Sequence, residues 1–353
     1  MANKKNLENA KKNKNDEFYT RREDIERELK NYRDHFNNKT VFCNCDDPEY
    51  SNFYFFFKEQ FDRLKLKKLI TIHYNKEGNS YKLEISRNSD GIMQGPVKLP
   101  LSGNGDFRSD ESIELLKESD IVVTNPPFSL FREYVLQLIE YEKKFLIIGH
   151  QNAISYKEIF KLIKGNKIWL GINGGSKEYE VRGNISHLTI SRIDDKGKKF
   201  TKMGNTHWFT NLDHSKRHEF IDLWSEYDPE LYPKYENYDA INVDESKNIP
   251  KNYFEPMGVP ITFLDKINPE QFEILAIGIV GSIEFTKQVK MEILKNGEPT
   301  GKYTINAKGT LYKKYNPKLD KKPPAFKDCE TSELYSSIYA RMIIRNKGNK
   351  NGN

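Results

Sequence analysis

Two kinds of hydrophobic pattern alternate along the first 150 residues. Apolar residues recur at helical spacing in some stretches, and short apolar runs between them have the length and composition of buried strands. The predicted helices are Ile25–Tyr32, Phe53–Phe61, Ser112–Lys117 and Leu130–Tyr141. The predicted strands are Thr40–Cys43, Lys68–Tyr74, Asp120–Thr124 and Phe145–Ile148. This alternation is typical of a parallel sheet with right-handed crossovers, and it predicts a doubly wound α/β domain.

The other segments are less regular. Tyr81–Ser86 alternates and predicts an inserted hairpin strand, ahead of a Gly- and Pro-rich stretch over Gly91–Gly105. Further β-like segments are separated by loops after Gly149: Lys167–Ile172, Ser186–Ile193, Thr206–Thr210 and Ile261–Leu264. Asp213–Ser225 is predicted to be a helix, and Asp228–Pro260 a long surface connection.

These patterns divide the chain into four regions. Residues 1–15 carry five lysines among polar residues and are expected to form a flexible basic arm. Residues 16–212 form the predicted α/β domain, and residues 213–345 form a predicted α+β region. Residues 346–353 are expected to be a disordered tail.

Composition limits the class of protein. The chain has 353 residues, of which 37% are hydrophobic and 12% aromatic, which excludes a small binding module and predicts a folded protein. No apolar run approaches the ~20 residues that span a bilayer, and an apolar signal segment is missing, so we expect no membrane contact and a cytoplasmic location. The three cysteines are too few for a disulfide framework and are expected to be free thiols. The net charge of +6 permits a polyanionic partner.

The most specific local motif is Asn125-Pro126-Pro127-Phe128, directly after the predicted strand that ends at Thr124. An amine conjugated to an aromatic ring is a poor nucleophile, and it becomes reactive when two acceptors hold its hydrogens. The Asn125 side-chain oxygen and the Pro126 carbonyl can be those acceptors, because prolines fix φ and supply no competing N–H donor. Phe128 can stack on the ring. The alternative is a rigid Pro-Pro turn that only ends the strand.

This motif and five others make the chain resemble the EcoRI-type adenine-specific (N6-adenine) DNA methyltransferase family. The resemblance extends from Asp16 to about Arg345. The segments that carry it are Asp16–Thr20, Cys43–Pro48, Gly105–Phe107, Asn125–Phe128, Gly204–Leu212 and Gly258–Asp265.

The resemblance implies a fold, a reaction and partners. The fold is a Rossmann-like S-adenosylmethionine-dependent methyltransferase sheet in residues 16–212, followed by a target-recognition, DNA-binding region in residues 213–345. The reaction moves a methyl group from S-adenosyl-L-methionine to N6 of an adenine flipped out of double-stranded DNA, within a restriction–modification system. We expect no metal, and a monomer or weak dimer.

The resemblance also assigns roles to individual residues. The catalytic residues are Asn125, Pro126, Pro127 and Phe128, and Phe128, Trp208 and Phe209 stack on the target base. The cofactor-binding residues are Phe18, Tyr19, Thr20, Asn44, Cys45, Asp46, Asp47, Asp106 and Phe107. Structural alternatives exist for several of them: Phe18 and Tyr19 as core aromatics, Asp106 as the cap of the helix at Ser112, and Trp208 as a buried residue.

The chain departs from the family pattern at two positions. Residues 46–52, which follow the first strand, contain no glycine, whereas related enzymes have a Gly-rich turn there. The second strand ends in His73-Tyr74-Asn75 without the acid that binds the cofactor ribose, so Asn75 or Asp46 is left as the substitute.

Two histidines, a thiol mechanism and two other functions are weaker candidates. His214 and His218 have metal-capable spacing without a third ligand, which favours a solvated helix face. A thiol mechanism is rejected because no Pro-Cys motif is present. A protein glutamine-N5 methyltransferase uses similar Asn-Pro-Pro-aromatic chemistry, and a non-catalytic DNA-binding protein on a decayed methyltransferase fold would explain the missing glycines. Basic residues of the C-terminal region favour DNA as the partner: Lys234, Lys251, Lys287, Lys290, Lys313, Lys314, Lys321, Lys322, Arg341 and Arg345.

Overall fold

The computed structural model describes residues 18–75, 78–182 and 189–348. The chain folds into two compact units, Met1–Ser215 and Lys216–Asn353, and each is described by itself. The predicted basic arm, residues 1–15, lies outside the described residues. Within the described ranges, no helix is both long enough and apolar enough to cross a membrane.

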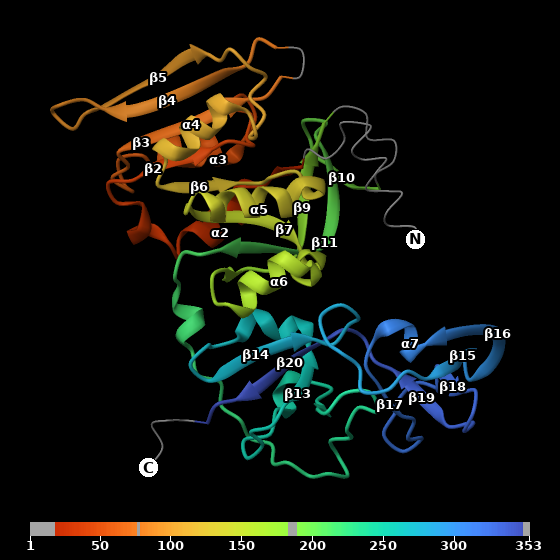
Figure 1. The fold of residues 1–353 in the computed structure, drawn as a ribbon. Helices are drawn as coiled ribbons and strands as arrows, with labels where there is room; N and C mark the ends of the chain where they lie inside the picture. The colour runs from red at the N-terminus through yellow and green to blue at the C-terminus, as the bar shows by residue number, and fades with distance from the viewer. Residues whose placement is uncertain (1–17, 76–77, 183–188, 349–353) are drawn as a thin grey trace. The chain divides into compact units, whose positions relative to one another are not determined.

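A mixed sheet of 11 strands forms the centre of the first unit (Figure 1). The spatial order is β1-β9-β11-β7-β6-β2-β3-β4-β5, and β8 and β10 also pair with β11. The strands are β1 (Tyr19–Thr20), β2 (Thr40–Cys43), β3 (Lys68–His73), β4 (Tyr81–Arg87), β5 (Met93–Pro100), β6 (Ile121–Thr124), β7 (Lys144–His150), β8 (Trp169–Leu170), β9 (Gly175–Val181), β10 (Ile190–Ile193) and β11 (Lys199–Thr210). The central strands β7, β6, β2 and β3 are parallel, and the outer pairs are antiparallel.

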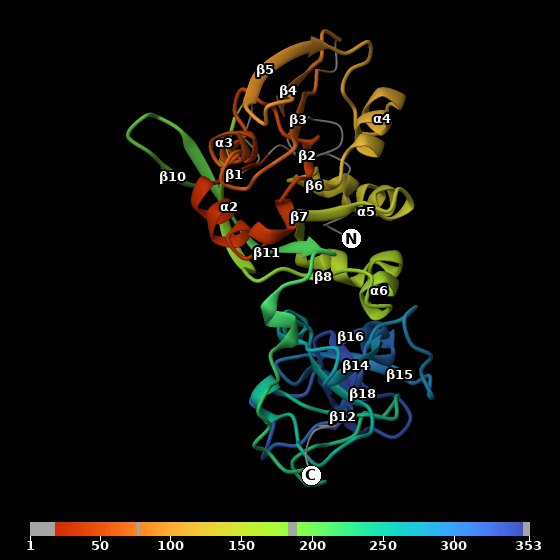
Figure 2. The same cartoon turned by 90° about the vertical axis from the view of Figure 1, so that its left-hand side faces the viewer.

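Helices cover both faces of this sheet. Figure 2 shows α2 and α3 on one side, and α4, α5 and α6 on the other. The helices of this unit are α2 (Arg22–Leu29), η1 (Arg33–Phe36), α3 (Asn52–Glu59), α4 (Asp110–Glu118), η2 (Phe128–Leu130), α5 (Phe131–Glu140), η3 (Gln151–Ser155) and α6 (Lys157–Lys164). The unit is therefore a mixed α/β fold with two covered faces.

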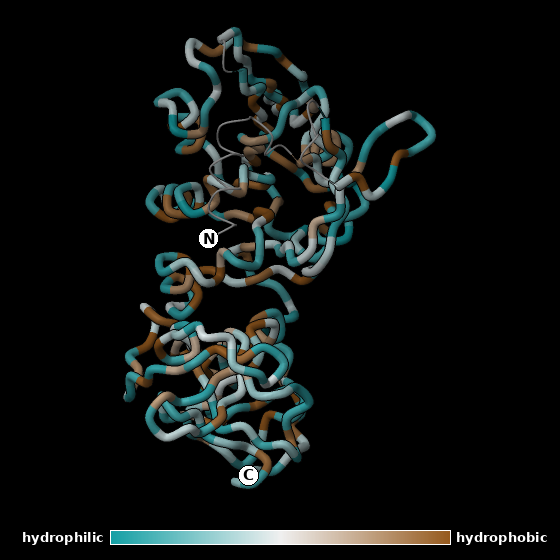
Figure 3. Tube along the Cα trace, turned by 90° about the vertical axis from the view of Figure 1, so that its right-hand side faces the viewer, coloured by the Kyte–Doolittle hydropathy of each residue, from teal (hydrophilic) through white to brown (hydrophobic). Residues whose placement is uncertain are grey.

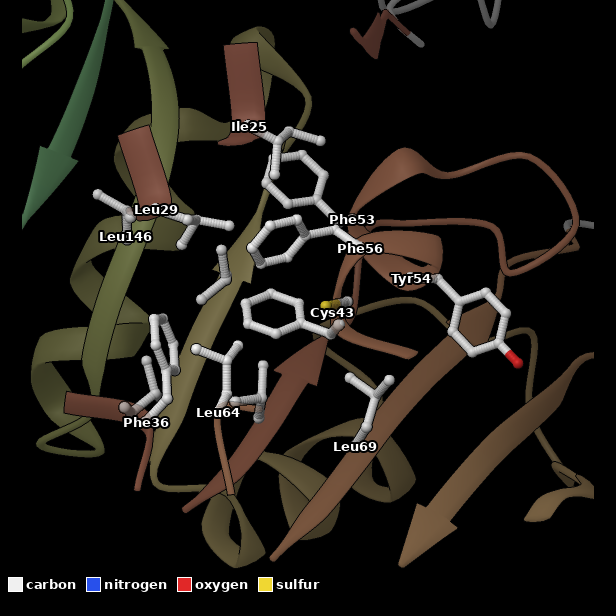
Figure 4. Close-up of a cluster of buried hydrophobic side chains, with 14 of the residues drawn as sticks. Ile25, Leu29, Phe36, Cys43, Phe53, Tyr54, Phe56, Leu64, Leu69 and Leu146 are labelled. Atoms are coloured by element: carbon white, nitrogen blue, oxygen red, sulfur yellow. The ribbon is translucent and has the colours of Figure 1, made fainter. Parts of the chain in front are cut away.

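A large cluster of buried side chains lies between the sheet and the helices α2 and α3 (Figure 4). Ile25 and Leu29 are four residues apart on α2, so both point to the sheet. Phe53 and Phe57 have the same spacing on α3, which begins at its N-cap Ser51. Both rings are fully buried, so the helical spacing in the sequence produces this packed face.

Most elements predicted for the first 150 residues are confirmed. The predicted helices correspond to α2, α3, α4 and α5, and the predicted strands to β2, β3, β6 and β7. The βαβ unit is confirmed by the parallel pairing of β2 with β3. Tyr81–Ser86 is the hairpin strand β4, and its partner is β5, which occupies the stretch predicted only as Gly- and Pro-rich. β9 and α6 were not predicted.

The second unit contains two small sheets. One has the order β12-β13-β20-β14 and the other β16-β15-β18-β19-β17. The strands are β12 (Ile241–Asn242), β13 (Met257–Pro260), β14 (Phe272–Ile277), β15 (Lys290–Lys295), β16 (Glu298–Ile305), β17 (Tyr312–Lys314), β18 (Phe326–Asp328), β19 (Leu334–Ser337) and β20 (Arg341–Asn346). Short helical turns complete the described part of the C-terminal region: η4 (Ser215–His218), η5 (Ser246–Asn248), η6 (Ile261–Lys266) and α7 (Asn306–Gly309).

Several predictions for the C-terminal region are wrong. The α+β prediction overstated the helix content of the C-terminal region, because the described residues of this region form only short helical turns. Asp213–Ser225 forms only the turn η4, and Ile261–Leu264 belongs to η6 rather than to a strand.

Two further predictions in this region are corrected by burial. Residues 228–260 are not a surface connection, since Tyr235, Ile241 and Ile249 are buried. The predicted disordered tail begins too early, because Asn346 ends β20 and is buried. Apolar side chains in loops can pack as core without any periodic pattern, so periodicity does not reveal their burial.

Candidate active site

The predicted catalytic and cofactor residues gather where parallel strands of the first unit end. β2 lies between β3 and β6 and pairs with both in parallel. Asn44 therefore follows β2 at the same sheet edge at which Asn125 follows β6 and Tyr74 follows β3. The carboxyl edge of an open α/β sheet is where such folds bind ligands.

The Asn125 side chain is held in one orientation. Its Nδ2 donates to the main-chain oxygen of Phe18 at 2.5 Å. A carbonyl oxygen only accepts, so this contact identifies the amide nitrogen and places Oδ1 on the other side. Oδ1 is buried and has no hydrogen-bond partner among the described residues. A buried acceptor without a donor is costly, and it fits a site that receives its donor from a ligand.

The residues after Asn125 form a rigid turn with an aromatic ring at its end. Pro126 is buried, and Pro127 precedes the short helix η2, which starts at Phe128. The rings of Phe128 and Phe18 stack with centroids 5.9 Å apart and an angle of 20°. Tyr179 of β9 packs edge-on against both. Phe128 is only partly buried, so its ring can still contact a flat ligand beside Asn125.

Asp46 connects the turn after β2 with the end of β6. Its carboxylate accepts from Ser51 Oγ at 2.7 Å and from Thr124 Oγ1. Thr124 Oγ1 in turn accepts from the main-chain N–H of Cys45. Burial raises the pKa of Asp46 to about 7, against the lowering effect of hydrogen bonds from Thr124, Ser51 and the Asn125 backbone. The carboxylate faces protein groups, so its position does not support Asp46 as the ribose ligand.

A second set of contacts joins Asn44 to the segment that contains Asp106 and Phe107. Tyr134 of α5 donates its hydroxyl to Asn44 Oδ1, and its ring packs edge-on against Phe107 with centroids 5.1 Å apart. Gln137 Nε2 donates to the Phe107 carbonyl at 3.2 Å. Asn44 Nδ2 is buried and without a partner among the described residues. These contacts bring two predicted cofactor motifs together on one side of the sheet.

The turn after β2 is built without glycine. None of residues 44–52, all of which the structure describes, has a positive φ. Asp47 Oδ1 accepts from the Glu49 N–H at 2.9 Å, and Ser51 Oγ caps α3. Asp47 Oδ2 lies 3.0 Å from His73 Nδ1 at the end of β3. Side-chain hydrogen bonds thus shape this turn, which explains how it forms without the usual glycines.

Asp106 does not cap the following helix. The N-cap of α4 is Ser109, whose hydroxyl accepts from the Ser112 N–H. Asp106 instead accepts from Arg108 Nε and Nη2 at 2.8 Å and 2.7 Å. The hydrogen bond from Arg108 lowers the pKa of Asp106 below its ordinary value. Gly105 approaches Ile72 and His73 of β3 with a φ of +76°, a conformation in which a Cβ would clash, so the Asp106 loop lies against the end of β3.

The N-terminal motif lies beside these loops. β1 pairs with β9, and Asn52 of α3 donates to the Thr20 carbonyl at 2.7 Å. Tyr19 packs edge-on against Tyr50, and Arg182 covers the rings of both. Thr20 is buried, and its Oγ1 has no partner among the described residues. Phe18 and Tyr19 are only partly buried. The motif therefore borders the same sheet edge as Asn125.

Trp208 and Phe209 lie elsewhere. Both have 0% exposed surface in β11. Trp208 packs against Phe53 of α3, and Phe209 against Phe131 of α5. A ring without exposed surface has no face for a base in this conformation, so the stacking role predicted for these two residues is corrected to one in the core.

The histidines and cysteines that the structure describes form no separate site. His214 is buried, with Nε2 3.0 Å from the Leu170 carbonyl, so the predicted solvated helix face is wrong for this residue. The described residues contain no group of three or more His, Cys, Asp or Glu that could hold a metal ion. Cys43, Cys45 and Cys329 are free, and burial raises the pKa of the Cys43 thiol well above its ordinary value.

Three residues of this region were not singled out from the sequence: Thr124, Tyr134 and Tyr179. Thr124 and Tyr134 lie within correctly predicted elements, but their partners are far away in sequence. Thr124 had a local signal, because it directly precedes Asn125. Tyr179 had none, since β9 was not predicted.

The arrangement defines an α/β protein with an oriented amide acceptor and an aromatic ring at the ligand-binding edge of its sheet. The family model of the adenine-specific methyltransferase EcoRI matches residues 6–347, so the chain belongs to this family and is an adenine-specific methyltransferase. It is 51% identical over 296 residues to the Type II methyltransferase M.EcoRI of Escherichia coli, covering 78% of this chain and 89% of that protein.

Two relatives from mycoplasmas are similar as well. The chain is 45% identical to the Type II methyltransferase M.MpnI of Mycoplasma pneumoniae, over 75% of this chain and 83% of that protein. It is 43% identical to the Type II methyltransferase M.MgeORF184P of Mycoplasma genitalium, over 75% of this chain and 84% of that protein. No solved structure was found to match the chain.

Proposed function

We propose that the chain methylates N6 of an adenine flipped out of double-stranded DNA, as the modification enzyme of a restriction–modification system. The observation that carries this proposal is the buried, partnerless Oδ1 of Asn125 beside the partly exposed ring of Phe128. An adenine has a flat face for the ring and an exocyclic amine for the acceptor. The names of the relatives, all Type II methyltransferases, support DNA as the substrate.

S-adenosylmethionine is the methyl donor that a methyltransferase family implies, and the residues present fit it. Asn44 Nδ2 and Thr20 Oγ1 are buried at this sheet edge without partners among the described residues, and they suit the amino-acid end of the cofactor. Asp106 and Phe107 suit its adenine, as an acceptor and an apolar neighbour. Cys45, Asp47 and Tyr19 are the other residues proposed to surround the cofactor. Asn75 is the proposed ribose ligand, because the Asp46 carboxylate faces protein groups. When bound, the cofactor supplies an electrophilic methyl group.

The chain's own residues orient the target amine. Asn125 Oδ1 and the Pro126 carbonyl accept its two hydrogens and turn its lone pair away from the ring. The Phe18 carbonyl holds the Asn125 amide in place, so little reorganisation is needed on binding. Phe128 stacks on the flipped base and offsets part of the lost stacking within the duplex. The proton leaves after transfer, because the methylated amine is acidic.

The two units have different parts in this proposal. The parallel strands and two-sided helices of the first unit support a Rossmann-like methyltransferase sheet that holds the cofactor and the target base. Residues 213–345 provide target recognition, and exposed lysines such as Lys290, Lys321 and Lys322 provide phosphate contacts. Lys313 is excluded from this role, because it is buried and paired with Asp320.

The first test replaces Asn125 with alanine. We expect Asn125→Ala to lower kcat about 100-fold to 1,000-fold, because the acceptor matters chiefly in the transition state. Cofactor affinity, measured by calorimetry, should stay within a few-fold. The assay is transfer of radiolabelled methyl groups to unmethylated phage lambda DNA, with N6-methyladenine identified by mass spectrometry.

The matched control is Asn31→Ala, at an exposed asparagine of the same unit, which should keep wild-type activity. A kcat above about a tenth of the wild-type value in Asn125→Ala would contradict the assignment of Asn125. Label that enters a glutamine-containing peptide instead of DNA would favour the glutamine-amide methyltransferase.

A further inference from the structure

The hairpin of β10 and β11 projects from the body of the first unit, as Figure 2 shows, and it is largely hydrophilic in Figure 3. Its five cations are Arg192, Lys196, Lys198, Lys199 and Lys202. Two of them are neutralised internally, because Arg192 pairs with Glu178 and Lys198 with Glu180. Lys196, Lys199 and Lys202 are exposed and form no ion pair with any residue that the structure describes.

The tip of the hairpin is ordered by its own backbone contacts. Asp194 Oδ1 accepts from the N–H groups of Lys196 and Lys198 at 3.0 Å and 2.9 Å. The Asp194 N–H donates to the Lys198 carbonyl at 3.0 Å, and Gly197 has the positive φ that this turn requires. The Asp194 carboxylate thus faces backbone amides, while the Lys196 side chain points to solvent.

The register of the strands relates this hairpin to the aromatic site. Thr201 of β11 lies opposite Tyr179 of β9, and opposite residues of an antiparallel pair share a face. Lys199 is two residues from Thr201, so it is on the same face as Tyr179 and about 7 Å further along the strand. Tyr179 in turn packs against Phe128, with ring centroids 6.5 Å apart. Lys202 is on the opposite face of the strand, opposite Glu178.

We propose that Lys199 and Lys196 bind phosphates of the DNA strand that carries the target adenine. This inference rests on the proposed function. A flipped nucleotide rotates about its backbone and stays joined to its own phosphates, so these phosphates lie close to the ring that holds the base. A cation on the face of Tyr179 is placed to meet them. The catalytic unit therefore contributes its own phosphate contacts, in addition to those expected from the C-terminal region.

The experiment compares two lysines of one strand. Full-length Lys199→Ala and Lys202→Ala lose the same charge from opposite faces. Methyl transfer to unmethylated phage lambda DNA is measured at several salt concentrations. For Lys199→Ala we expect a several-fold lower kcat/KM for DNA, and a plot of log kcat/KM against log salt whose slope is smaller in magnitude by about 0.9. Lys202→Ala should have the wild-type kcat/KM for DNA and the wild-type salt slope.

Further variants separate charge from structure. Lys199→Arg should restore the wild-type slope, and adding Lys196→Ala to Lys199→Ala should reduce the slope about twice as much as Lys199→Ala alone. Affinity for S-adenosylmethionine should be unchanged in all of them. Equal slopes for Lys199→Ala and Lys202→Ala would overturn the inference while the proposed function stands. A wild-type chain that transfers no methyl group to this DNA would contradict the proposed function itself.

Discussion

A single carboxylate, that of Asp46, links the turn after β2 to the segment Asn125–Phe128. It accepts from Thr124, the residue before Asn125, and from Ser51, the N-cap of α3. The main-chain oxygen of Asp46 also accepts from Thr71 of β3 at 2.7 Å. Three neighbouring strands, β2, β3 and β6, are therefore connected at one residue, which makes Asp46 a positioning residue for Asn125.

The raised pKa of Asp46 makes stability depend on pH. The ordinary value is 3.8, and burial raises the pKa in the folded chain to about 7. Between these values the folded state keeps a proton that the unfolded state has released, so the free energy of unfolding falls as pH rises from about 4 to 7. Asp46→Asn cannot ionise at this position, so we expect its free energy of unfolding to fall less over the same pH range. Urea unfolding at several pH values measures the free energy of unfolding of both proteins.

The comparison that matters is the difference between the two pH profiles, because other groups titrate in both proteins. Asp90→Asn, at an exposed aspartate, is the matched control and should follow the wild-type profile. Parallel profiles for wild type and Asp46→Asn would show that Asp46 does not titrate in this range.

The candidate site was predictable from the sequence only where its residues are adjacent. Asn125 to Phe128 form one run, so their chemistry could be read directly. The contact of Asn125 with Phe18 spans 107 positions, and that of Thr124 with Asp46 spans 78. Such pairs depend on strand order, which hydrophobic periodicity does not determine. Trp208 was misassigned for a related reason, since a motif does not show whether its ring faces solvent or core.

At the scale of elements, helix α2 holds the loop between β8 and β9 through one buried residue. Glu28 has no exposed surface and accepts from the N–H groups of Ile172 and Asn173, both at 2.8 Å. It also accepts from the Tyr32 hydroxyl at 2.9 Å. Gly171 passes so close that a Cβ there would meet Glu28 Oε1. The loop leads into β9, which carries Tyr179, so Glu28 supports the aromatic site from a distance.

We expect Glu28→Ala to lower the free energy of unfolding by about 3 to 5 kcal/mol, because several buried donors would lose their acceptor. Glu26→Ala on the same helix is the matched control. Glu26 is exposed and pairs with Arg22 at 2.6 Å, so its loss should cost less than about 1 kcal/mol. Urea unfolding followed by circular dichroism measures both, and similar losses for the two variants would contradict the structural role of Glu28.

Elements with a strong periodic pattern were predictable, and those without one were not. α2 and α3 place apolar residues on one face, and β2 and β6 are short buried runs. β5 contains a glycine and two prolines, residues that are depleted in strands, so its composition indicated a loop. In the C-terminal region the strands are short and separated by loops whose apolar residues are buried. Their pairing depends on contacts between distant segments, which local propensity does not encode.

At the scale of the whole molecule, each unit has its own hydrophobic core. The first unit is built around the cluster that contains Phe53 and Trp208. The second has separate clusters around Ile343 and around Tyr312. The proposed cofactor residues all belong to the first unit, so ligand binding should stabilise that unit selectively.

Tryptophan fluorescence can measure this selective stabilisation of the first unit in the intact chain. Trp208 is fully buried in the first unit, whereas Trp224 of the second is 82% exposed, so the change in emission on heating reports mainly the first unit. With S-adenosylhomocysteine, the demethylated product, at about 100 times its Kd, we expect about 2.7 kcal/mol of stabilisation and a higher fluorescence midpoint. Circular dichroism should retain a transition that does not move. Trp224→Phe should leave the fluorescence transition in place. A single transition that both probes report at one midpoint, and that shifts as a whole with the ligand, would mean that the two units unfold together.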